Sequence, residues 1–176
     1  DAVVSDYERL AIHRAVQRMV QFCSGDLSAH YLDSVKDRLY CDAPQSQSRQ
    51  CAQSTLVYLF ELLIRMIAPI LVFTAEDSYS HYAFKTTKSV HELRFLEPGT
   101  YSTELASQEA DTTWAAVFSI KERVYQAAEV LRQNKTIKQF LQTRVAIAFP
   151  KSLAHLQSFT EWRSVLLVAE VTCTVD

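Results

Sequence analysis

The chain is poor in the two residues that most often interrupt regular structure, with only two glycines and four prolines among 176 residues. Phosphate-cradling loops need glycines at fixed spacings, and the sequence has no G-x-x-x-x-G-K, no G-x-G-x-x-G and no G-x-S-x-G run. Nucleotide binding by such a loop is therefore excluded. Together with a hydrophobic share of 48%, the scarcity of Gly and Pro favours long regular elements over turn-rich sheets, and we expect a mainly α fold.

Patterns typical of metal sites and disulfide frameworks are also missing. The four cysteines form no C-x-x-C pair, and the five histidines have no H-x-x-x-H spacing. Carboxylate pairs such as Asp33 with Asp37 have the spacing of a solvated helix face. We expect no metal site, no catalytic residue and reduced thiols, as in a cytoplasmic protein.

Charge alone does not indicate a nucleic-acid binder. Eighteen Lys and Arg against twenty Asp and Glu give a formal net charge of −2, whereas a self-sufficient binder of nucleic acid is strongly basic. The stretch 111–151 is locally basic, with seven Lys or Arg and three Asp or Glu. It could face phosphates, or it could be the solvated face of a helix.

One apolar stretch, residues 56–73, is long enough to raise the question of a membrane span. Glu61, Arg65 and Pro69 interrupt it, and the first two have the i,i+4 spacing of a helix-surface pair. We expect a buried core helix here and no membrane association. The N-terminal residues also lack the basic and apolar regions of a secretory signal.

Apolar residues recur three to four positions apart over most of the chain, which predicts three or four helices before residue 85 and one after it. The expected helices cover 6–23, a run up to residue 40 after a break at Gly25 and Asp26, 52–67, 74–82 with Thr74 as its cap, and 113–133. Residues 85–109 lose this period. We expect a long connection there, briefly extended at 90–96 and turning at Pro98 and Gly99.

The last forty residues change character. Apolar residues alternate at 145–149 and again at 171–175, and residues 152–163 between them have helical spacing. We therefore expect a strand, a helix and a strand. The predicted organisation is a helical bundle over residues 1–140 with a small α/β appendage over residues 141–176.

Several segments resemble one family of enzymes, the isoleucyl-tRNA synthetases. Residues 26–40 read DLSAHYLDSVKDRLY and are similar to the family's D-L-S-x-x-Y-L-D-x-x-K-D-R-L-Y run. Residues 68–77 resemble its A-P-I-L-x-F-T-A-E-E segment, 89–91 its short extended segment, and 114–132 its W-x-x-x-x-x-x-R-x-x-V helix. Residues 135–147 follow the pattern K-x-I-G-x-x-L-x-A-x-V-x-I, so the resemblance spans nearly the whole chain.

Two positions depart from the family pattern. Lys138 stands where the family has a glycine, which removes a glycine turn before the first C-terminal strand. Tyr79 replaces a tryptophan that often follows the F-T-A-E-E segment. Neither change affects the K-D-R-L-Y run, which is the most discriminating segment.

The resemblance implies a helical bundle of the class I synthetase anticodon-binding type, which binds the anticodon stem-loop of isoleucine tRNA. The parent enzyme of that family charges this tRNA with isoleucine using ATP and magnesium. Its H-I-G-H and K-M-S-K-S motifs and its paired zinc cysteines do not occur here, so we expect no catalytic site and no cofactor in this chain. The implied partners are the tRNA and a catalytic domain of the same chain, in a cytoplasmic monomer.

Recognition of an unpaired RNA loop uses aromatic or guanidinium planes for stacking and Lys or Arg for the backbone. Both kinds of residue occur together around the second helix. The candidates for phosphate or base contact are Lys36, Arg38 and Arg18, those for stacking are Phe22 and Tyr40, and Lys121, Arg132 and Lys135 are secondary phosphate contacts. The alternatives are an internal salt bridge for Arg38 and a half-buried packing role for Tyr40.

Three other functions remain open at this point. The chain could be the corresponding helical domain of a sister synthetase for valine, leucine, methionine or cysteine, although the K-D-R-L-Y run disfavours this. It could be a helical protein-interaction module, which an exposed apolar patch would support. A stand-alone enzyme would need a cleft holding a strongly perturbed acid or base.

Overall fold

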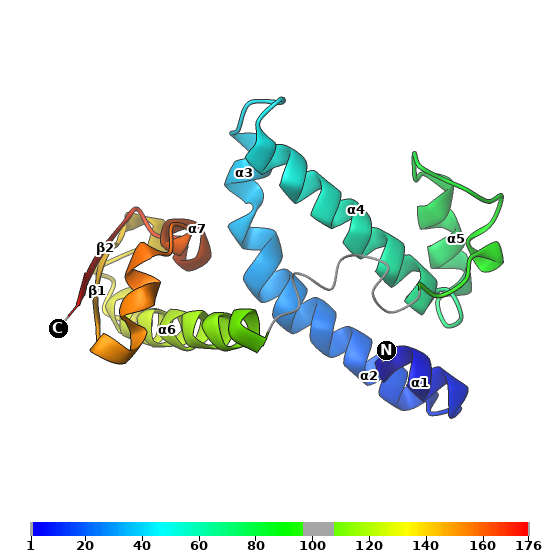
Figure 1. The fold of residues 1–176 in the computed structure, drawn as a ribbon, viewed down its shortest axis with the longest axis horizontal. Helices are drawn as coiled ribbons and strands as arrows, with labels where there is room; N and C mark the ends of the chain where they lie inside the picture. The colour runs from blue at the N-terminus through cyan, green and yellow to red at the C-terminus, as the bar shows by residue number, and fades with distance from the viewer. Residues whose placement is uncertain (1, 97–107, 176) are drawn as a thin grey trace. The chain divides into compact units, whose positions relative to one another are not determined.

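The computed structural model describes residues 2–96 and 108–175, and they form two compact units (Figure 1). The first unit contains Asp1–Ala29 and Arg38–Tyr101, and the second contains His30–Asp37 and Ser102–Asp176. Helices dominate the described residues, and a small sheet lies near the C-terminus. The prediction of a mainly α fold with a C-terminal strand, helix and strand is confirmed.

The first expected helix is interrupted near its start. Helix α1 spans Ala2–Glu8 and helix α2 spans Ile12–Gln21. Between them Leu10 adopts a left-handed backbone conformation with φ 56°. The N–H of Leu10 donates to the C=O of Tyr7 (2.9 Å) and that of Ala11 to the C=O of Asp6 (2.8 Å), the pattern that closes a helix C-terminus. The prediction of one helix over 6–23 is therefore wrong.

The break expected at Gly25 and Asp26 does not occur. Residues Phe22–Leu32 continue as a π-helical segment, η1, and helix α3 spans Lys36–Tyr40. The wider π-helical turn accommodates an extra residue, and π-helical segments are rare in proteins. Val35, expected to point inward, is buried.

Helix α4, Gln47–Ile67, forms where the sequence predicts a helix over 52–67, but only Ala52 and Ile64 in it are buried, so the expectation of a buried core helix is wrong. The side chain of Ser46 caps it by accepting a hydrogen bond from the backbone N–H of Arg49 at 3.2 Å. Helix α5 spans Val72–Ser80 and begins two residues before the expected cap at Thr74. Ends of helices α4 and α5 form a core with the short 3₁₀ turn η2, Val90–Glu92; its buried residues are Ile64, Ala68, Ala75, Tyr79 and Val90.

Hydrogen bonds fix the turn η2 to α5. The carboxylate of Glu76 accepts from the hydroxyl of Ser89 (2.7 Å) and from the N–H of Val90 (3.0 Å). The hydrogen bond from Ser89 is the main reason that the pKa of Glu76 lies below its usual value. Residues Val90–Glu92 thus form a capped 3₁₀ turn, so the stretch expected to be extended over 90–96 does not begin as extended chain. The turn expected at Pro98 and Gly99 lies outside the described residues.

The second unit is built on helix α6, Gln108–Gln133, and two parallel strands, β1 (Arg144–Phe149) and β2 (Glu170–Val175). The 3₁₀ segment η5, Lys151–Ser158, and helix α7, Trp162–Leu166, connect the strands. One apolar core joins these elements; its buried residues are Val117, Phe149, Leu156, Trp162, Val165, Leu166 and Val168. The boundary predicted at residue 140 remains a prediction, but α6 shares its core with the strands that follow.

The turn after α6 forms without the glycine of the related family. Lys135 takes the left-handed conformation, with φ 57°. Its N–H donates to Arg132 (3.0 Å) and the N–H of Thr136 to Leu131 (2.9 Å), which closes the helix. The N–H of Lys138 then donates to the side-chain oxygen of Gln142 at 3.1 Å, so the chain turns three residues before the substituted position.

In the described ranges, no helix is long and apolar enough to cross a membrane.

Replacing Leu10 by glycine should stabilise the first unit. The leucine side chain is 82% exposed and contributes little burial, while its left-handed backbone carries a steric cost that glycine avoids. We expect Leu10→Gly to raise the free energy of unfolding in urea by about 0.5–1 kcal/mol. The control Val20→Gly, at an exposed position inside α2, should lower it by about 0.5 kcal/mol. A loss of stability in both variants would contradict the left-handed turn.

Candidate nucleic-acid interface

The eight candidate residues divide between the two units. Four belong to the first unit and four to the second. The first unit holds Arg18, Phe22, Arg38 and Tyr40, and the second holds Lys36, Lys121, Arg132 and Lys135.

A buried carboxylate orients Arg18. Asp6 is only 3% exposed, and its Oδ2 accepts a hydrogen bond from Nε of Arg18 at 2.6 Å. Its other oxygen lies 3.3 Å from a guanidinium nitrogen of Arg14. Two cations offset the cost of burying one carboxylate, and the Arg18 side chain remains about half exposed. Sequence reasoning missed Asp6, because the pairing depends on how α1 folds back along α2.

The structure brings Arg18 and Phe22 to one hollow of about 390 Å³ in the first unit. Asp26 lines the same hollow. Its remaining wall is mostly apolar and comes largely from α4, through Leu59, Leu62, Leu63 and Met66. The hydroxyl of Tyr7 donates to the C=O of Met66 at 2.6 Å, which links α1 to this wall. A planar base or an apolar side chain would fit the chemistry of this hollow.

Tyr40 is the most exposed of the aromatic candidates, at 80%. The half-buried packing role considered for it is therefore wrong. The loop that follows is anchored, since Arg49 donates to the C=O of Asp42 at 3.1 Å and Ser46 caps α4. An exposed ring beside an anchored loop, two residues after Arg38, is a suitable stacking platform for an unpaired base.

Two candidate cations of the second unit, Arg132 and Lys36, have carboxylate partners. Nε and Nη2 of Arg132 donate to the two oxygens of Glu129 at 2.7 and 2.8 Å. These bonds lower the pKa of Glu129 and raise the pKa of Arg132. Nζ of Lys36 lies 2.6 Å from Asp33. Such exposed i,i+3 pairs contribute little to stability, so a phosphate could displace the carboxylates. The fourth candidate of this unit, Lys135, is exposed and lies in the left-handed turn after α6.

Lys121 lies in a different environment from the other candidates. It is only 4% exposed, and its Nζ lies 5.4 Å from the centre of the Tyr125 ring. Burial lowers the pKa of Lys121, and the charge of Asp33 opposes this shift. Burial likewise raises the pKa of Tyr125. An ammonium withdrawn from solvent is poorly placed to meet a backbone phosphate, which argues against the contact predicted for Lys121.

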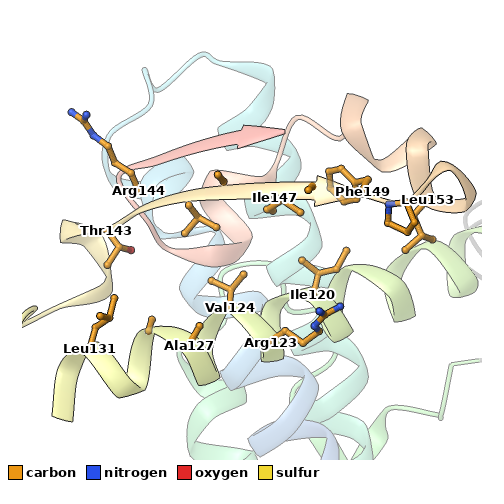
Figure 2. A pocket seen from close by; sticks show the side chains of 15 residues that line it. Ile120, Arg123, Val124, Ala127, Leu131, Thr143, Arg144, Ile147, Phe149 and Leu153 are labelled. Carbon is orange, nitrogen blue, oxygen red and sulfur yellow. The ribbon is translucent and has the colours of Figure 1, made fainter. Parts of the chain in front are cut away.

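A hollow of about 510 Å³ lies between α6 and β1 (Figure 2). Figure 2 shows Ile120, Val124, Ala127 and Leu131 along the helix below the strand, with Arg144 directed away from the helix. Arg144 pairs with Glu170 at 3.1 Å. The lining is mostly apolar, and the described residues contain no cluster of His, Cys, Asp and Glu suited to a metal ion. The sequence did not reveal this hollow, because it exists only where the helix and strand meet.

Comparison with protein families gives one match. The family model for the anticodon-binding domain of tRNA ligase matches residues 1–147. The match covers α1 to α6 and most of β1.

Three curated relatives illustrate the similarity. An isoleucine–tRNA ligase of Neisseria meningitidis is 38% identical over 171 residues, which cover 96% of this chain and 18% of the relative. Isoleucine–tRNA ligases of Brachyspira hyodysenteriae and Carboxydothermus hydrogenoformans are 32% and 30% identical; they cover 91% and 96% of this chain, and the chain covers 17% and 18% of them. The chain thus spans less than a fifth of the length of these relatives.

Replacing the buried Lys121 by methionine tests the cost of its burial. A lysine whose pKa is lowered by folding binds its proton more weakly in the folded state, so wild-type stability rises with pH up to the unfolded pKa near 10.4. We expect Lys121→Met to be at least as stable as the wild type at pH 7. Thermal unfolding should show that the difference in stability between Lys121→Met and the wild type becomes smaller as the pH rises toward 10. The exposed control Lys138→Met should stay close to the wild type in stability at pH 7. A marked loss of stability at pH 7 in Lys121→Met alone would contradict the expectation.

Proposed function

This chain belongs to the family of anticodon-binding domains of tRNA ligases, and we propose that it binds the anticodon stem-loop of isoleucine tRNA as part of an isoleucine–tRNA ligase. The family match over residues 1–147 is the observation that carries the proposal. The name shared by relatives that cover 91–96% of the chain supports the choice of tRNA.

The geometry of the first unit supports binding of an unpaired loop. Bases that leave the stack of an RNA loop are held on aromatic side chains, while Lys and Arg hold the backbone. Tyr40 offers an exposed ring next to an anchored loop, and Arg38 precedes it on α3. Arg18 and Phe22 offer a second cation and ring at the hollow beside α4.

The charging reaction belongs, in this proposal, to other parts of the parent enzyme. A catalytic part of the same protein would use ATP and magnesium to join isoleucine to the tRNA. The chain described here would hold the far end of the tRNA. The proposal also includes a monomeric enzyme in the cytoplasm, where charged tRNA is used.

A protein-interaction surface is a second candidate function, and one observation favours it. Leu71, Val72 and Phe73 are consecutive apolar residues at the start of α5, all exposed, and Phe73 is 89% exposed. Contiguous exposed apolar groups are a feature of surfaces that contact other proteins. This surface could serve the parent enzyme in addition to RNA binding.

Binding to a synthetic anticodon hairpin of isoleucine tRNA tests the proposal. We expect Tyr40→Ala to weaken binding by about 5- to 150-fold in fluorescence anisotropy at low salt, because a lost base stack costs about 1–3 kcal/mol. Phe84→Ala, which removes another exposed ring of the first unit, should bind like the wild type.

The anticodon sequence and the salt concentration separate the alternatives. A hairpin with an altered anticodon should bind more weakly than the native one. Equal, salt-sensitive binding of both hairpins would mean that the chain holds only the RNA backbone. No binding at low salt would contradict the proposal and favour the protein-interaction function.

A further inference from the structure

The second unit contains a hollow of about 370 Å³ formed by three segments that are far apart in the sequence. The start of α3 contributes Lys36 and Asp37, the 3₁₀ turn η4 (Phe140–Gln142) contributes Phe140 and Leu141, and the region of α7 contributes Arg163 and Val168. Its volume lies in the range of about 300–1,000 Å³ that is usual for sites of small organic groups. A single nucleotide is of suitable size.

One wall of the hollow is aromatic and supported from within the unit. The ring of Phe140 lies 4.9 Å from the ring of Tyr125, centre to centre, with 33° between their planes. Tyr125 lies in turn beside the buried Lys121. Val168 is buried and Leu141 is exposed. The wall therefore combines a ring held in place with apolar neighbours, which suits the flat face of a base.

The rim of the hollow carries charges of both signs. Arg163 and Asp37 are exposed, and Lys36 pairs with Asp33 at 2.6 Å. The carboxylates of Asp33 and Asp37 oppose the binding of a bare anion such as inorganic phosphate. They suit a nucleotide, since its phosphate takes a cation and the exocyclic amino group of its base takes an acceptor.

We propose that this hollow receives one unstacked nucleotide of a bound RNA loop. The base stacks on Phe140, its exocyclic amino group donates to the carboxylate of Asp37, and Arg163 holds the phosphate. The inference rests on the proposed function and adds a selectivity to it. Adenine, cytosine and guanine carry an exocyclic amino group and uracil does not, so the hollow should prefer the first three.

The test uses the whole chain and anticodon hairpins in which one loop position at a time carries 2-aminopurine, a fluorescent base with an amino group. One position should change its fluorescence on binding, and Phe140→Leu, which keeps an apolar side chain but removes the ring, should abolish that change. Arg163→Gln should weaken hairpin binding by at least about fivefold, because a hydrogen bond to a charged group is lost. Arg144→Gln removes the same charge from an exposed arginine outside the hollow, and it should bind like the wild type.

Asp37→Asn provides a second variant that keeps the size of the side chain. With uracil placed at the responsive position, the wild type should bind more weakly than with adenine, and Asp37→Asn should reduce this difference. Hairpin binding by the wild type with unchanged affinity in Arg163→Gln, or an unchanged response in Phe140→Leu, would overturn the hollow as a nucleotide site and leave the proposed function standing. Failure of the wild type to bind any hairpin would overturn the proposed function itself.

Discussion

The second unit depends on the packing of α6 against β1 and α7. Val117 of α6 is fully buried with Phe149 at the end of β1 and Leu166 at the end of α7. Because Val117 points into the core, the residues four and eight positions later on α6, Lys121 and Tyr125, lie on the same side of the helix. Lys121 is buried as a result, and the Tyr125 ring is held against Phe140. A core of apolar side chains thus sets the position of an aromatic wall that we assign to RNA.

The overall charge limits how such a chain can bind a polyanion. A formal net charge of −2 does not attract phosphates at a distance. Several of the chain's exposed cations already have carboxylate partners, as Arg132 has Glu129 and Lys36 has Asp33. Binding must therefore come from local contacts, namely stacking on exposed rings and exchange of carboxylates for phosphates. Such binding is weak in one domain and becomes strong when several contacts act together on one tRNA.

Much of the fold was predictable because the spacing of apolar residues along the sequence matches the period of the helix or strand that buries them. The long helix α4, the helix α6 and the strand, helix and strand at the end all follow from apolar spacing. The breaks were less predictable. Leucine seldom adopts the left-handed conformation, so nothing in the sequence marked the turn at Leu10 that follows α1. Conversely, Gly25 looked like a break, but the π-helical turns pass through it.

The candidate interface was predictable only in part. Residue type and a family resemblance identified Tyr40, and its exposure suits the stacking role proposed for it. Residue type and the family resemblance could not show that Lys121 would be buried, because its burial depends on which other segment packs over that part of the helix. The hollow that we propose for a nucleotide could not be predicted from the sequence either, because Asp37, Phe140 and Arg163 come together only through tertiary packing.

The most direct test of an RNA-binding surface is an NMR titration of the ¹⁵N-labelled chain with the anticodon hairpin of isoleucine tRNA. We expect amide shifts to change around residues 36–41, 139–141 and 163–168, with little change in α5. Changes confined to Leu71, Val72 and Phe73 at the start of α5, or no changes at all, would contradict binding of the RNA loop by this chain.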